Sequence, residues 1–283
     1  MRVKRKMLRE KLNKHKIITV EVLLSTTPHL DNLLNAIKPL KDYIDAVNIP
    51  SNPLGRLKPD ALCFAHLIQE KMGIETIPHF VARHFTSLGF ESHLLGAKAL
   101  AIENILCVTG DSPVGGRSTF ELNSPKLLDI ASSLSNGLTF ARKAIEPIDF
   151  CLCTSFNPNV PNVHGEFIKI KEKCRCGAEV FFTQPIFKPE VFLNILKEFR
   201  QRHKDIKVVA GLSFLYTKKR AFRLMKFLGI PYEYINNIEE KDETEILLET
   251  AEKLRDYVDG FYIIPIAKYH NALDLIRRIR KIL

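Results

Sequence analysis

Apolar runs rich in β-branched residues alternate with amphipathic stretches along nearly the whole chain. Several of the runs are continuously apolar, as is typical of strands that are buried on both faces of a parallel sheet. The runs predict eight strands, at residues 17–24, 44–49, 74–81, 103–109, 149–154, 179–183, 207–212 and 260–264. The amphipathic stretches predict eight helices, near residues 30–40, 58–72, 87–98, 124–143, 164–176, 188–203, 217–228 and 269–282, and an extra helix at 240–257 before the last strand.

This order of elements predicts a single (β/α)8 barrel, the TIM barrel, in which each strand is followed by a helix. The alternative is a doubly wound sheet, but no strand is followed by the G-x-G-x-x-G fingerprint of dinucleotide-binding folds. Because no linker or repeat divides residues 17–283, we predict one domain there, preceded by a basic extension at 1–16. Active sites of TIM barrels lie at the carboxyl ends of the strands, so polar residues at those ends are the candidates for function.

The composition is that of an ordinary globular protein, with 46% hydrophobic and 26% charged residues. The formal net charge is +10, but residues 1–16 contribute +7 of it through eight Lys or Arg and one Glu. A basic segment of this kind is more often a solvated helix or arm than a contact for nucleic acid or another partner. Because no helix-turn-helix, zinc-finger or RNA-binding aromatic signature accompanies it, we expect no nucleic-acid partner.

The chain also lacks the patterns of membrane and secreted proteins. No apolar run approaches the roughly 20 residues that cross a bilayer, so we expect no membrane span. The N-terminus has neither the apolar core nor the small-residue cleavage site of a secretory signal. We therefore expect a cytoplasmic protein, in which thiols are kept reduced.

Six cysteines include two C-x-C pairs, Cys151 with Cys153 and Cys174 with Cys176. On a strand the first pair points to one face, whereas on a helix the members of the second pair are about 200° apart. Neither pair has the C-x2-C spacing that is typical of zinc sites. We therefore expect small buried hydrophobic side chains and no metal, with a redox or metal role as the alternative.

Four motifs lie at the carboxyl ends of predicted strands. VEVLL contains Glu21, IPHFVARHFT contains His79, ILCVTGDSP contains the turn at 109–111, and GAEVFFTQPIF contains Gln184. Together and in this order they resemble the methylenetetrahydrofolate reductase family.

The resemblance is close over residues 17–214 and looser from there to 283. Segments 47–79 and 94–113 are most similar to the branch of the family that is also found fused to homocysteine methyltransferase domains.

The resemblance implies a TIM barrel that binds FAD, or FMN as second choice, at its mouth. In this family the flavin passes a hydride to 5,10-methylenetetrahydrofolate, which yields 5-methyltetrahydrofolate for one-carbon metabolism and methionine biosynthesis. The cofactor carries the difficult step, and the protein orients it. The electron donor would be NAD(P)H or a partner electron-transfer protein, and we expect a homo-oligomer or a subunit of a larger complex.

Glu21 is the strongest candidate for catalysis. Its carboxyl is embedded in an apolar strand, where desolvation raises the pKa as a general acid near neutral pH requires. The resemblance makes it the proton donor to the substrate; the alternative is a buried Glu paired with Lys or Arg. Asp111 matches the family's acidic residue beside the flavin and pterin, and Gln184 suits the amide edge of the pterin. Their alternatives are a turn residue and a helix cap.

The resemblance also assigns contacts with the cofactor. Thr109 and Gly110 let the backbone approach the flavin ring, while Asn157 lies on the adenine-ribose side. The phosphates need cations, which Lys169 and Lys173 supply one turn apart unless they merely form a solvated helix face. The full set of expected cofactor contacts is His79, Thr109, Gly110, Asp111, Ser155, Asn157, Lys169 and Lys173.

The chain departs from the family pattern at Pro50, Ser155, Glu172, Arg220 and Leu224. Glu172 replaces a basic phosphate partner, which weakens the case for FAD over FMN. Arg220 and Leu224 replace a Gln and a Phe that hold the pterin and stack on nicotinamide. Because such stacking supplies about 0.5–1.5 kcal/mol beyond burial, its loss argues against direct use of NAD(P)H. We expect Arg220, together with Lys268 after the last strand, to contact the substrate.

Two other functions compete with the reductase. A non-redox TIM-barrel lyase would use Lys268 or Lys207 as a Schiff-base residue, which requires a buried Lys with a lowered pKa. A flavin-bearing electron-transfer subunit would not turn over folate itself, and the retention of Glu21, Asp111 and Gln184 argues against it.

Overall fold

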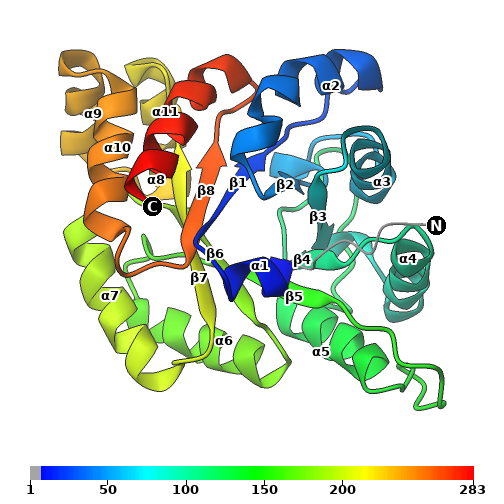
Figure 1. The fold of residues 1–283 in the computed structure, drawn as a ribbon. Helices are drawn as coiled ribbons and strands as arrows, with labels where there is room; N and C mark the ends of the chain where they lie inside the picture. Colours follow the sequence, from blue (N-terminus) through cyan, green and yellow to red (C-terminus); the bar gives the residue numbers. More distant parts are fainter. Residues whose placement is uncertain (1–7) are drawn as a thin grey trace.

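Eight parallel strands close into a barrel in which neighbours in space are also neighbours in sequence (Figure 1). The computed structural model describes residues 8–283. The strands are β1 (Ile17–Glu21), β2 (Ala46–Ile49), β3 (Glu75–Val81), β4 (Asn104–Val108), β5 (Cys151–Phe156), β6 (Val180–Pro185), β7 (Lys207–Ser213) and β8 (Gly260–Ile264). Every predicted strand is present, and pairing of β1 with β8 closes the predicted (β/α)8 barrel.

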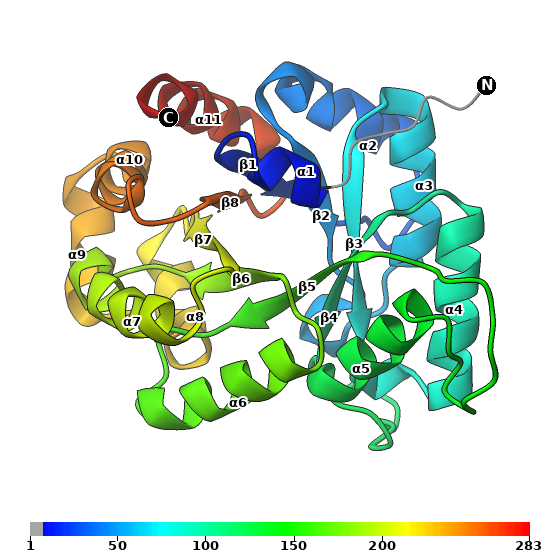
Figure 2. The same cartoon turned by 60° about the horizontal axis from the view of Figure 1, so that its bottom comes forward.

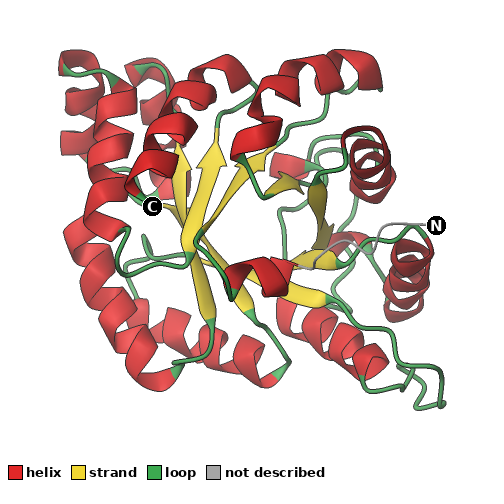
Figure 3. Cartoon of the chain, viewed as in Figure 1, coloured by secondary structure: helices red, strands yellow, loops and turns green. Residues whose placement is uncertain are grey.

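Helices surround the barrel on its outer side (Figure 3). They are α2 (Leu30–Ile37), η1 (Lys38–Tyr43), η2 (Pro53–Gly55), α3 (Ala61–Met72), η3 (Ala82–His84), α4 (Ser87–Ala99), α5 (Ser124–Ser135), α6 (Val163–Arg175), α7 (Pro189–Arg202), α8 (Lys218–Leu228), α9 (Tyr232–Glu240), α10 (Glu243–Leu254) and α11 (Tyr269–Ile282). Among residues 8–283, no helix combines the length and the apolar content needed to cross a bilayer.

The helices differ from the prediction in two places. α10 is the predicted extra helix, but α9 precedes it and was not predicted. The helix predicted to reach residue 143 ends at Ser135, because Asn136 closes its last turn and Gly137 follows in the left-handed region at φ 75°. Glycine there is a common way to end a helix.

The barrel interior is filled by alternate residues of the strands. Its packed cluster includes Ile17, Ala46, Ile77, Leu106, Cys151, Cys153, Val180, Phe182, Val209 and Tyr262. Cys151 and Cys153 thus share one face, as predicted, and burial raises the pKa of the Cys153 thiol. Because side chains alternate along a strand, the inward positions nearer the carboxyl ends include Glu21, Asn48, His79, Ser155 and Gln184.

The opposite end of the barrel is closed by α1 (Leu8–Leu12) (Figure 2). Leu8 and Leu12 are buried in the interior cluster, and Arg9 pairs with Asp149 and Glu179 at the starts of β5 and β6. The interpretation of the basic N-terminal segment as a solvated helix or arm is therefore wrong for residues 8–12, because two leucines four residues apart bury one side of this helix. Residues 1–7 of that segment lie outside the described residues.

Candidate active site at the barrel mouth

The carboxyl group of Glu21 lies at the end of β1, between the buried Val20 and Val22. Burial raises its pKa from 4.5 to about 7, although a hydrogen bond from the Tyr262 hydroxyl to Oε2 opposes the shift. No Lys or Arg of residues 8–283 forms an ion pair with it, so the alternative of a buried ion pair finds no support. Glu21 can therefore hold a proton near neutral pH.

Tyr262 was not among the predicted site residues, because GFYII is an apolar strand in which a Tyr looks like part of the core. The ring is indeed buried in the barrel interior, where it packs edge-on against Phe182 at 5.5 Å. Alternation on β8 was the available signal, since β8 is hydrogen-bonded to β1 and brings Tyr262 beside Glu21.

Asn48 and His79 form the next part of the mouth. Asn48 stands opposite Glu21 in the register of β1 and β2, and its Nδ2 lies 3.4 Å from His79 Nε2. Burial lowers the pKa of His79 to about 3, which keeps the imidazole neutral. Asn48 Oδ1 is buried without a hydrogen-bond partner among the described residues. Because buried polar atoms are nearly always paired, this oxygen indicates a place for a ligand donor.

The turn after β4 brings a backbone segment against the end of β3. Gly110 has φ 78°, and a Cβ there would lie 2.1 Å from Cγ1 of Val81, so only glycine fits. Arg83 holds the turn, because its Nε donates to the Gly110 carbonyl at 3.2 Å. Thr109 Oγ1 accepts the backbone N–H of Ser124. The carboxylate of Asp111 is exposed and accepts no hydrogen bond from the described residues, so it caps nothing.

Gln184 ends β6 with a half-buried side chain that forms no hydrogen bond within the described chain. The alternative role as a helix cap is wrong, because the residue before α7 is Lys188 and it has no side-chain cap. Thr183 holds the strand end by accepting the Gly211 N–H at 2.8 Å and donating to the Gln184 carbonyl. The amide of Gln184 therefore stays free at the mouth.

The two lysines of α6 have different surroundings. Lys173 is buried, and its Nζ donates to the Ser155 carbonyl at 2.6 Å, while burial lowers its pKa to about 8. Lys169 is exposed and pairs with Glu166 at 3.2 Å. The other carboxylate oxygen of Glu166 accepts the backbone N–H of Asn157. The structure thus gathers four predicted cofactor residues around the end of β5, with Lys173 enclosed and Lys169 open.

Arg220 and Lys268 converge on Tyr216, which was not predicted. Lys268 Nζ lies 4.3 Å and Arg220 Cζ 5.8 Å from the centre of its ring. The Tyr216 hydroxyl donates to the Pro265 carbonyl at 2.6 Å, which ties the ends of β7 and β8 together. Nη1 of Arg220 is buried without a hydrogen-bond partner in the described chain.

The two lysines considered as Schiff-base residues of a lyase lie in unsuitable places. Lys268 is exposed, and Lys207 lies at the start of β7, where it pairs with Asp259 at 3.4 Å. Neither has the buried position at the mouth that a Schiff-base lysine requires. Residues 8–283 also contain no cluster of His, Cys, Asp or Glu suited to a metal ion.

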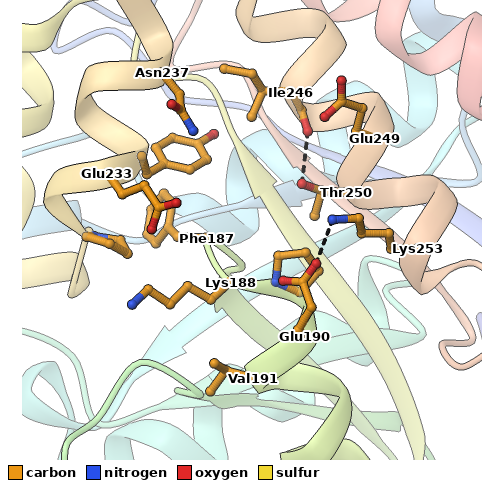
Figure 4. A pocket seen from close by; sticks show the side chains of 13 residues that line it. Phe187, Lys188, Glu190, Val191, Glu233, Asn237, Ile246, Glu249, Thr250 and Lys253 are labelled. Carbon is orange, nitrogen blue, oxygen red and sulfur yellow. Dashed lines mark hydrogen bonds and ion pairs between the residues drawn. The ribbon is translucent and has the colours of Figure 1, made fainter.

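A separate pocket of about 360 Å³ lies outside the barrel, between the start of α7 and helices α9 and α10 (Figure 4). Acidic and basic side chains both line it, including Lys253 and Glu190, which form an ion pair at 2.6 Å. None of the predicted site residues lines it. The strand ends, rather than this pocket, bring the candidate residues together.

Comparison with known proteins supports the assignment from the motifs. The family model described as methylenetetrahydrofolate reductase matches residues 6–259. A probable methylenetetrahydrofolate reductase (NADPH) of Caenorhabditis elegans is 22% identical over 65% of this chain and 29% of the relative. Methylenetetrahydrofolate reductase 2 of Saccharomyces cerevisiae is 21% identical over 85% of this chain and 42% of the relative. The chain thus spans less than half the length of either relative.

A solved structure has the same fold. It is an uncharacterized protein from Clostridium thermocellum that binds two copies of 5-methyl-5,6,7,8-tetrahydrofolic acid, with a TM-score of 0.71 and 15% identity over 98% of this chain and 100% of that one. At this identity the match shows the barrel alone. The family match, which covers most of the chain, shows more: the chain belongs to the methylenetetrahydrofolate reductase family.

Proposed function

We propose that the protein binds a flavin at the barrel mouth and reduces 5,10-methylenetetrahydrofolate to 5-methyltetrahydrofolate. The observation that carries the proposal is the carboxyl of Glu21, whose pKa of about 7 lets it donate a proton near neutral pH. Family membership and the names of the two curated relatives support the same reaction.

The residues at the mouth fit a flavin. A flavin ring carries an edge of alternating donors and acceptors, and Asn48 Oδ1 and the free amide of Gln184 offer complementary groups. The backbone at Gly110 has no side chain to keep a planar ring away. A bound flavin would supply the hydride.

The chain's own residues hold the reactants and move the proton. Glu21 donates to N10, the nitrogen of the p-aminobenzoyl part that is released when the five-membered ring opens, and Tyr262 orients its carboxyl. Asp111 and Gln184 bind the pterin, since their polar groups have no other partners in the described chain. Arg220 and Lys268 attract the carboxylates at the other end of the substrate.

Cofactor contacts follow from the same geometry. His79 stays neutral and presents its ring to the flavin. The exposed Lys169 meets a phosphate, whereas the enclosed Lys173 supports the chain at Ser155. Thr109 and Asn157 complete the walls of the proposed flavin site. We propose FAD as the cofactor and FMN as the alternative, since Glu172 stands where relatives carry a basic phosphate partner.

The electron donor is proposed to be a partner protein rather than NAD(P)H. Leu224 of α8 is half-buried and packs against the apolar cluster between α8 and α9. It therefore offers no aromatic plate for a nicotinamide. We also propose that the chain works as a homo-oligomer or as a subunit of a complex with that donor.

The decisive experiment separates cofactor binding from catalysis. Purified protein is titrated with FAD and with FMN by calorimetry and absorbance, and we expect binding of at least one. The flavin-loaded protein is then reduced chemically and mixed with methylenetetrahydrofolate in a stopped-flow instrument. Substrate-dependent reoxidation is the expected result; absence of flavin binding, or binding without reoxidation, contradicts the proposal.

A further inference from the structure

The outer face of α8 combines exposed aromatic and basic side chains. Phe222 is 42% exposed and Phe227 54% exposed, although both are large apolar residues. The exposed ring of Tyr232, at the start of α9, packs edge-on against Phe222 at 6.0 Å. Phe222 and Tyr232 thus form an exposed aromatic pair, and Phe227 is exposed about 140° further around the axis of α8.

Three cations lie between Phe222 and Phe227 around the helix axis. Lys219, Arg223 and Lys226 follow one another at the three- and four-residue spacing that places side chains on one side of a helix. All three are exposed, and none forms an ion pair with a residue of 8–283. Like charges at this spacing destabilise a helix by a few tenths of a kcal/mol, and α8 contains no acidic residue to offset them.

The other side of α8 shows that this face is not needed for packing. Ala221 is buried, and Leu224, Met225 and Leu228 pack toward α9. Lys218 pairs with Glu239 at 2.9 Å, and Arg220 reaches Tyr216 at the barrel mouth. The helix is therefore anchored by its inner residues. Its outer residues Lys219, Phe222, Arg223, Lys226 and Phe227 are not needed to hold it in place.

We propose that the face formed by Lys219, Phe222, Arg223, Lys226, Phe227 and Tyr232 docks a small acidic electron-carrier protein. Aromatic rings and Arg are enriched at the centres of protein interfaces, and exposed basic side chains attract an acidic partner. A single helix face with one neighbouring ring offers little area, which matches the small interfaces of transient electron-transfer complexes.

The position of α8 agrees with this occupant. The helix starts shortly after the carboxyl end of β7, and Arg220 near its start reaches Tyr216, so the start of the docking face lies beside the barrel mouth. A second copy of the chain fits less well, because a two-fold contact would bring the same cations of both copies together.

This inference rests on the proposed function, which sets the electron count. Conversion of a methylene bridge to a methyl group consumes two electrons and two protons. Two molecules of a one-electron iron–sulfur carrier would therefore be oxidised for each folate reduced.

The test uses the full chain and a small acidic ferredoxin as the probe. Binding of oxidised ferredoxin is measured by calorimetry at low and at high ionic strength, which needs no turnover. We expect affinity to fall on the order of tenfold with added salt, and R223E/K226E to lower the low-salt affinity by about the same factor. F222A/F227A is expected to lower it by about tenfold at both ionic strengths.

The matched control is K38E/K41E. Lys38 and Lys41 are exposed, lie three residues apart like Arg223 and Lys226, form no ion pair with residues 8–283, and belong to η1, which precedes β2 at the other end of the barrel. This variant should change ferredoxin affinity by less than about twofold. Circular dichroism verifies that all variants are folded.

Unchanged ferredoxin affinity in R223E/K226E overturns the proposal. So does loss of self-association, or of binding to a single-stranded oligonucleotide, in F222A/F227A while ferredoxin binding stays intact. Reoxidation of chemically reduced protein by methylenetetrahydrofolate does not involve this face. Its failure refutes the proposed reductase, whereas ferredoxin binding still decides the docking surface.

Discussion

The two ends of the barrel use similar polar residues in opposite ways. At the end where the strands begin, Asn104 accepts the Leu8 N–H and donates to Glu75, and Arg9 joins Glu179 and Asp149. At the mouth, Asn48 has an unpaired side-chain oxygen, and the side chains of Gln184 and Asp111 form no hydrogen bond in the described chain. Paired groups contribute to stability, whereas unpaired groups at a mouth are available to a ligand.

Glutamates at the two ends give the largest expected contrast. Glu21→Gln removes the proton donor but keeps its volume, so reoxidation of the reduced protein by methylenetetrahydrofolate should slow by about 10²–10⁴-fold. Glu75→Gln changes a buried carboxyl at the start of β3 that is bonded to Asn104. It should lower the midpoint of thermal unfolding and leave the rate unchanged.

Stopped-flow reoxidation and thermal unfolding, measured on both variants, test whether Glu21 serves the reaction and Glu75 serves stability. Flavin binding should persist in Glu21→Gln, which separates a lost proton from a lost site. Equal rates in Glu21→Gln and the parent would mean that the proton comes from another group.

Asparagines provide the second contrast, in stability. Asn104→Ala leaves the buried Leu8 N–H and a Glu75 oxygen without this partner, so the free energy of unfolding should fall by about 2–3 kcal/mol. Asn48→Ala removes the same volume but only one long contact to His79, and should cost clearly less. Urea denaturation of both variants measures the difference. If Asn48→Ala proves the more costly change, the mouth is built for stability after all.

The sequence predicts the barrel well because its strands carry their own signal. A parallel strand buried on both faces is apolar throughout, so each of the eight is recognisable in isolation. α9 was missed because it is short, and its burial at Tyr234 and Ile235 depends on contacts with α8 and α10. The packing of α1 was missed because its charges outnumber its two buried leucines.

In the site, too, residues that stand out within one segment can be predicted, and residues whose role depends on contacts between segments cannot. Glu21 is visible in the sequence because a carboxyl group stands out in an apolar strand, whereas the absence of an ion pair with Lys or Arg of residues 8–283 is seen only in the structure. Tyr262 is not visible in the sequence, because it looks like part of the core. Asn48 is recognisable as a polar residue at a strand end, but its place beside Glu21 and His79 comes from strands that meet only in the closed barrel. Lys173 matched a family phosphate contact, but the depth of its burial could not be read from the sequence.

A third, smaller effect concerns pH. With a pKa of about 7, Glu21 is protonated below neutrality, so the reoxidation rate should be constant there and fall about tenfold per pH unit above it. Tyr262→Phe removes the hydroxyl that holds this pKa down, so the fall should begin at higher pH. The raised pKa also means that the contribution of Glu21 to stability is fully present below 4.5, is lost as pH rises from 4.5 to about 7, and does not change above that. Rates and unfolding midpoints recorded across pH 5–9 test both; an unmoved profile in Tyr262→Phe would contradict the assignment.

The smallest expected effect compares two exposed aspartates, Asp111 at the mouth and Asp149 at the other end. An exposed hydrogen bond from the pterin to this carboxylate contributes about 1 kcal/mol net, so Asp111→Asn should weaken folate binding by roughly fivefold. It should also shift the potential of a bound flavin upward, because a nearby negative charge disfavours the anionic reduced form. Stability should not change, since this carboxylate bonds to nothing in the described chain.

Asp149→Asn is the control, because it loses a surface ion pair with Arg9 that contributes at most about 1 kcal/mol to stability. Folate affinity and flavin potential should stay at the parent values in this variant. Calorimetric folate titration and a spectroelectrochemical potential, measured on both, test the pair. Because both substitutions remove one exposed charge, a general electrostatic effect of net charge would move the two variants equally. Only a shift confined to Asp111→Asn places its carboxylate beside the ligands, and equal behaviour of the two would remove Asp111 from the site.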